Sequence, residues 1–110
     1  MDWKYSDITW VNFDQSTAAS HEVVSATTAA GKKVILCGAV LLCAAAVSLT
    51  FEDADGTNIT GAMPAGANGG FVLPTNPLGY GKPTVISRGL FLLLSGAFQV
   101  GGTIGYRLVD

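Results

Sequence analysis

Two uncharged stretches of eighteen residues each, Val34–Phe51 and Gly89–Tyr106, dominate the hydrophobic pattern of the chain. Each is nearly as long as a membrane-spanning helix, which needs about twenty apolar residues. The second half of each stretch alternates between apolar and polar side chains, over residues 47–52 and 98–108. A period of two is typical of a β-strand with one buried face, because successive side chains of a strand point to opposite sides. We therefore expect strands at both places and no membrane span.

The first halves of the same stretches, residues 34–42 and 90–94, are apolar at both parities. A strand of this kind is covered on both faces. The small residues of Cys43–Ala46 and Ser95–Ala97 mark a chain reversal in each stretch. The pattern thus predicts two β-hairpins, with the domain core over one face of each first strand. The other cover is a second sheet, the N-terminal segment or another subunit, and we favour another subunit.

The N-terminal segment, residues 1–19, is rich in aromatic side chains: Trp3, Tyr5, Trp10 and Phe13. One interpretation is a first strand with irregular flanks, since chain termini are often tied down in this way. The other is an arm whose aromatic side chains anchor on a neighbouring subunit, because aromatic residues are enriched at interface anchors. Both interpretations stay open at this point.

Glycine and proline concentrate in residues 56–81, which hold seven of the fourteen glycines and three of the four prolines. The dipeptide Asp55-Gly56 at its start is typical of a hairpin turn. We expect short strands at residues 58–63 and 71–73, separated by rigid loops.

At 110 residues the chain has the length of one domain. Only 13% of its residues are charged and its net charge is −2. This predicts no nucleic-acid partner, because no basic patch exists to neutralise phosphates. Globular proteins usually carry about 25% charged residues, so the low fraction indicates self-association.

The cysteines, Cys37 and Cys43, would lie about 20 Å apart on an extended strand. This separation is beyond the roughly 7 Å between Cα atoms that a disulfide allows. We expect both to be reduced and buried. The first residues lack the layout of a secretory signal. Together these features favour synthesis in the cytoplasm.

No motif predicts a catalytic, cofactor or metal site. Ser20-His21-Glu22 has the letters of a catalytic triad, but neighbouring residues of a strand point to opposite faces. Asp53 and Asp55 resemble the start of a calcium loop without its downstream ligands. The glycine-rich segment at 66–70 lacks the lysine of a phosphate-binding loop. The protein is therefore expected to be no enzyme and to need no cofactor.

Turn residues and strand pattern carry a resemblance to a known group. The segments Thr60–Pro64, Ala67–Gly70 and Asn76–Tyr80 resemble small β-rich virion proteins of tailed bacteriophages, as do Leu92–Ala97, Val100–Gly102 and Tyr106. The resemblance covers roughly residues 30–110 and implies a β-sandwich module that decorates or cements the capsid, often as a trimer. It implies a homotrimer that docks on the major capsid protein, at the capsid exterior of the virion, after synthesis in the host cytoplasm.

The alternative is a receptor- or carbohydrate-binding module of a phage fibre or tail. Such a site would need exposed aromatic rings beside hydrogen-bonding side chains, which Trp3, Trp10, Asn58 and Asn68 are candidates to supply.

The predicted fold class is all-β: an antiparallel, jelly-roll-like β-sandwich of residues 20–110 with an extended N-terminal arm, residues 1–19. The candidate subunit and capsid contacts are its apolar and aromatic residues: Trp3, Tyr5, Trp10, Phe13, Phe71, Leu78, Tyr80, Leu90 and Leu92.

Overall fold

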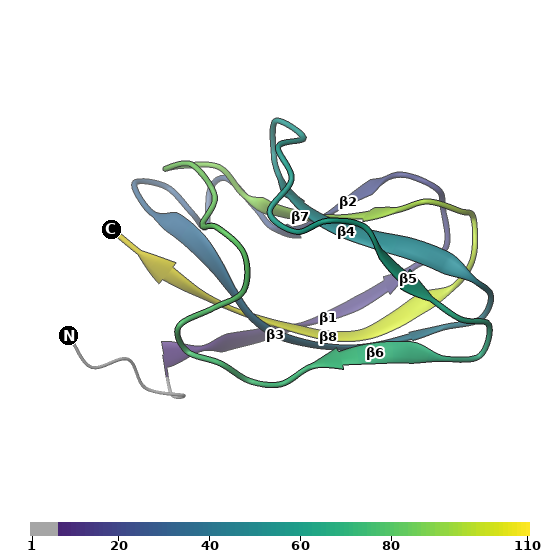
Figure 1. Ribbon diagram of the computed structural model, residues 1–110. Coiled ribbons are helices and arrows are strands. Elements are labelled where there is room, and N and C mark those ends of the chain that lie inside the picture. The colour runs from purple at the N-terminus through teal and green to yellow at the C-terminus, as the bar shows by residue number, and fades with distance from the viewer. Residues whose placement is uncertain (1–6) are drawn as a thin grey trace.

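In the computed structural model, which describes residues 7–110, two four-stranded antiparallel sheets pack face to face (Figure 1). The first sheet has the order β1 (Thr9–Gln15), β8 (Val100–Val109), β3 (Lys33–Cys43), β6 (Gly70–Leu73), and the second the order β2 (Ser20–Val24), β7 (Leu90–Leu94), β4 (Val47–Asp53), β5 (Met63–Ala65). The predicted antiparallel β-sandwich is confirmed. No helix among the described residues is long and apolar enough to cross a membrane.

The strand order is that of a jelly roll. Six of the seven connections pass from one sheet to the other, and only β4 and β5 are consecutive neighbours within a sheet. A jelly roll of eight strands combines two Greek keys in this way. The jelly-roll-like prediction is therefore confirmed.

The two predicted hairpins are wrong. β3 and β4 lie in different sheets, as do β7 and β8, and the real partners are β3 with β8 and β4 with β7. Tight hairpin turns need residues with positive φ, and no residue of 44–46 or 95–97 has one. The short connections instead carry the chain across the gap of roughly 10 Å between two packed sheets.

The core lies between the sheets and takes alternate residues of each strand. On β7, Leu90, Leu92 and Leu94 are fully buried, whereas Phe91 and Leu93 face outward and are half-buried. On β8, Val100, Ile104 and Tyr106 are buried as predicted, although Gly105 on the other parity is buried too. Phe98 was expected on the same buried parity but is exposed, because it belongs to the loop before β8.

The chain itself covers part of the outer face of β3, where we had favoured a second subunit. The backbone N–H groups of Asn76 and Tyr80 donate to the carbonyl oxygens of Cys37 and Leu36, both at 2.8 Å. These backbone bonds place segment 74–80 along the edge of the first half of β3, where it continues β6. The segment reaches over the outer face at Pro77, whose carbonyl oxygen accepts from Arg107 of β8. Val40 and Leu42, in its second half, remain exposed.

Within the predicted arm, residues 9–15 form β1, which pairs with β8 along its whole length. Phe13 of this strand is buried in the core. The structure thus agrees with the first-strand interpretation for these residues and places them within the sandwich. The remaining arm residues Trp3 and Tyr5 lie outside the described part of the chain.

Candidate protein-interaction site

Four connections meet at one end of the sandwich, on the right in Figure 1. They are residues 16–19, 44–46, 66–69 and 95–99, and consist of alanine, glycine, serine, threonine, asparagine, glutamine and Phe98. None of them contains a charged residue. We call these four connections the uncharged end.

Hydrogen bonds brace the uncharged end from within. The backbone N–H of Ala44 donates to the carbonyl oxygen of Gln99 at 2.9 Å, and that of Cys43 donates to Gly69 at 2.6 Å. The side-chain amide of Gln99 donates to the carboxylate of Asp14 on β1. Connections from distant parts of the sequence are thereby held against one another, which gives the end a defined shape.

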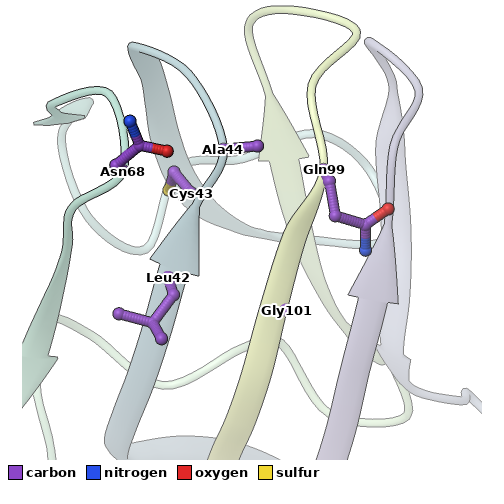
Figure 2. Close-up of a pocket in the computed structure, with 6 residues that line it drawn as sticks. All are labelled: Leu42, Cys43, Ala44, Asn68, Gln99 and Gly101. Carbon is purple, nitrogen blue, oxygen red and sulfur yellow. The ribbon is translucent and has the colours of Figure 1, made fainter.

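An open hollow of about 420 Å³ lies beside these connections and is lined by Leu42, Cys43, Ala44, Asn68, Gln99 and Gly101. Figure 2 shows its walls: Leu42, Cys43 and Asn68 on one side, and the backbone of β8 at Gly101 on the other. The side chain of Gln99 points toward β1 and leaves the hollow open. Carbon atoms dominate the lining, and Leu42 is 67% exposed.

Further apolar side chains surround the hollow. Val40 and Val72 are opposite one another on β3 and β6, on the same outer face as Leu42, and both are exposed. Phe98 is 44% exposed, packs against Gly96 and does not line the hollow of its own chain. Large exposed apolar groups gathered at one place are typical of interaction sites.

The opposite end is built from residues 25–32, 54–62 and 74–89, and is charged. There the guanidinium of Arg88 lies 3.5 Å from a carboxylate oxygen of buried Asp53 and 2.6 Å from one of Asp55. The other carboxylate oxygen of Asp53 accepts hydrogen bonds from the backbone N–H groups of Asp55 and Thr57. We call these three connections the charged end.

This ion-pair cluster replaces the calcium hypothesis. A guanidinium occupies the position between the two carboxylates, and the described residues contain no group of three or more side chains able to hold a metal. The predicted turn at Asp55-Gly56 is confirmed, with Gly56 at φ +81°.

Several buried polar residues were missed by the sequence reasoning. Thr50 and Glu52 of β4 were expected on the solvent face but are buried, as are Thr84 and Arg107. The hydroxyl of Thr84 accepts from the N–H of Val34 at 2.9 Å and donates to the carbonyl oxygen of Arg88 at 3.2 Å. Arg107 was expected on the solvent side of β8, yet it is buried and donates to the carbonyl oxygen of Pro77. No sequence signal marks the roles of Thr84 and Arg107, because segment 74–89, which contains Thr84, meets β3 and β8 only in the folded chain.

Both cysteines are free and buried, as predicted. Burial raises the pKa of the Cys37 thiol, and the nearby positive charge of Arg107 opposes this rise. Burial alone raises the pKa of Cys43. Neither thiol is therefore activated as a nucleophile.

Ser20 and His21 do not combine into a catalytic arrangement. The hydroxyl of Ser20 donates to Glu52 of β4, whereas the ring of His21 packs edge-on against Phe13, with 6.1 Å between centroids. The nitrogen Nε2 of His21 lies 2.8 Å from the carbonyl oxygen of Thr17. The serine and the histidine thus have separate structural partners.

The structure divides the seven predicted contact residues that it describes into three groups: buried, half-buried and exposed. Phe13, Leu90 and Leu92 are buried in the core, so their assignment to an interface is wrong. Phe71 and Tyr80 are half-buried and pack against the same core.

Trp10 and Leu78 are exposed and stay candidates, although one face of the Trp10 indole already rests on Gly38 and Gly105. Sequence reasoning missed Val40 and Leu42, which were taken as doubly covered, and also Phe98.

The residues suggested for carbohydrate binding are not brought together. Trp10 lies on the outer face of the first sheet, over Gly38 and Gly105. Asn58 forms an isolated antiparallel β-bridge with Glu52 of β4, and Asn68 belongs to the uncharged end. These three side chains therefore do not form one binding surface.

Comparisons of the chain with protein-family models, with curated proteins and with solved structures find no significant match. The function is therefore argued from the geometry of the two ends.

Proposed function

We propose that the protein is a non-enzymatic structural virion protein that decorates, or cements, a bacteriophage capsid. It self-associates as a homotrimer and docks on major capsid subunits at the capsid exterior. It is synthesised in the host cytoplasm, and it binds neither nucleic acid nor membrane. The observation that carries this proposal is the division between an uncharged end with an apolar hollow and a charged end. Such a division suits a module that makes two different protein contacts.

The fold and the sequence resemblance support the same role. Jelly rolls occur in viral capsid domains, although also in lectins. A fold alone does not decide function, which depends on the sites it carries. The resemblance of residues 30–110 to small virion proteins supplies the specific assignment.

The charged end is the proposed capsid-docking surface. Its connection 74–89 exposes Leu78, Val85 and Ile86, with Lys82 beside them. Hydrogen bonds hold this connection on the sandwich, including that of the Thr84 hydroxyl with Val34. Charges beside exposed apolar side chains give specificity for a different protein through electrostatic complementarity.

The test is co-sedimentation of the purified protein with capsid shells stripped of decoration, from the tailed phage that encodes the chain. The proposal predicts saturable binding at a fixed number of copies per capsid subunit. Ile86→Asp should weaken this binding at least tenfold, whereas Thr103→Ser, on the outer face of the first sheet, should leave it unchanged.

Absence of capsid binding would contradict the decoration role. If binding to a panel of glycans accompanied that absence, the fibre or tail module would take its place.

A further inference from the structure

The open hollow at the uncharged end and the exposed aromatic ring beside it both present apolar surface to solvent. We propose that Phe98 of one copy inserts into the hollow of a neighbouring copy, and that this contact assembles the oligomer. The inference rests on the self-association included in the proposed function, and it names the surface and the occupant.

The absence of charge argues for a second copy as occupant. In a symmetric oligomer the same patches meet around an axis, so a charge near that axis faces copies of itself. Like charges placed together cost several kcal/mol, and a contact with a different protein gains specificity from opposite charges. All four connections of the uncharged end lack charge, and this composition avoids the repulsion between like charges in a contact between identical chains. Asp14 and Glu22 lie outside the connections, on the flanking strands β1 and β2, and the carboxylate of Asp14 accepts from the side-chain amide of Gln99.

The occupant is further specified by what is exposed. Phe98 is the aromatic side chain of the four connections, and 44% of its surface is open to solvent. Buried aromatic anchors carry much of the energy of protein interfaces. The hollow offers the exposed apolar side chains of Leu42 and Ala44, with buried Cys43 between them and the amide of Asn68 at its edge.

The size of the end calls for an inserted anchor. The two shorter dimensions of the molecule, 26 and 21 Å, give the end a cross-section on the order of 500 Å², below the roughly 800 Å² per partner of a stable interface. Flat contact between two ends would therefore be weak. Insertion of Phe98 adds buried area, and because each copy has one ring and one hollow, each makes two such contacts. Val40 and Val72, beside the hollow, extend the buried surface.

The experiment separates the ring from the hollow. Phe98→Ala removes the ring and leaves the hollow, whereas Ala44→Trp fills the hollow and leaves the ring. Ala44 is exposed, so the larger side chain does not disturb the core. Light scattering should give the wild-type chain a multiple of 11.3 kDa, and each variant alone the monomer mass. An equal mixture of the two should recover a species of twice the monomer mass, because one intact ring then meets one intact hollow.

Ile86→Ala, which removes an exposed apolar side chain from the charged end, is the matched control and should assemble as the wild type does. Circular dichroism and thermal unfolding check that every variant is folded.

A wild-type chain that stays monomeric at all concentrations would overturn the inference, as would assembly of Phe98→Ala or a mixture that stays monomeric. Capsid co-sedimentation of Phe98→Ala distinguishes failure of this assembly contact from failure of the proposed decoration function. A monomer that still binds capsids leaves the decoration role standing.

Discussion

The two ends of the sandwich differ in their charged side chains. At the charged end, Arg88 bridges Asp53 and Asp55, and Lys32 pairs with Asp110 at 2.6 Å. At the uncharged end, backbone groups pair with one another, the four connections contain no charged residue, and the carboxylate of Asp14 on β1 accepts a hydrogen bond from Gln99. Ionic contacts therefore serve the fold at one end. The connections of the other end can be covered without desolvating a charge of their own, which is the expensive part of burying polar surface.

The largest effect on stability is expected from Arg88→Ala. Asp53 has 1% of its side chain exposed, and loss of the guanidinium leaves this carboxylate with backbone partners only. We expect the free energy of unfolding to fall by roughly 2 kcal/mol, since removing one partner strands a buried charge. Urea denaturation measures the loss. Lys82→Ala, an exposed position of the same connection, is the control and should change stability by less than about 0.5 kcal/mol. Equal losses in both variants would show that the ion-pair cluster does not hold the charged end together.

Thr84→Val should have the next largest effect. The substitution keeps the shape of the side chain but removes the hydroxyl that binds the N–H of Val34 and the carbonyl of Arg88. We expect a loss of about 1–2 kcal/mol, because a buried N–H loses its side-chain partner. Thr84→Ser should recover most of that loss, and a Ser variant as unstable as the Val variant would indicate that packing, not hydrogen bonding, is the cause.

The two thiols give a smaller, pH-dependent effect. Burial raises the pKa of Cys37 and Cys43 above the ordinary value of 9.0. Their contribution to stability is present below pH 9 and is lost as pH rises through the folded-state pKa, because only the unfolded chain then ionises freely. The double variant Cys37→Ala/Cys43→Ala should be less stable than the wild type at every pH, but its free energy of unfolding should decline less steeply between pH 8 and pH 10.5. An unchanged slope would contradict the pKa shifts.

The smallest effect concerns the exposed pair Lys32–Asp110. The hydrogen bond from Lys32, with its charge, lowers the pKa of the Asp110 carboxyl. The stabilising contribution is therefore present above the ordinary pKa of 3.8 and is lost as pH falls through the lower folded-state value. Asp110→Asn should reduce stability only slightly at neutral pH, and added salt should remove the difference. A difference that persists in high salt would place this pair among the structural contacts of the charged end.

The positions of the long strands β3, β4, β7 and β8 could be predicted from the apolar pattern of the sequence. The strand expected at residues 58–63 was wrong, because β5 covers only Met63–Ala65. Val100, Ile104 and Tyr106 are buried as their parity required. The pairing of the strands could not be predicted from the sequence, because it depends on whether a short connection turns back within one sheet or crosses to the other sheet. Residues 44–46 illustrate this, for they looked like a hairpin turn and proved to be a crossing.

The candidate site was less accessible to sequence reasoning. Each connection of the uncharged end is visible in the sequence as a run of small residues, but the four are separated by some twenty to thirty positions. Only the jelly-roll order brings them to one end. Phe98 was missed for a related reason: its parity matched the buried residues of β8, but the strand begins two residues later, at Val100.

The central claim, that the uncharged end is the face through which copies of this chain associate, is tested most directly by placing one charge at each end. Ala97→Asp and Val85→Asp both change an exposed side chain, and light scattering compares their masses with that of the wild type. The account predicts that Ala97→Asp is a folded monomer of 11.3 kDa, while Val85→Asp retains the wild-type oligomer. An assembled Ala97→Asp beside a monomeric Val85→Asp would contradict the account.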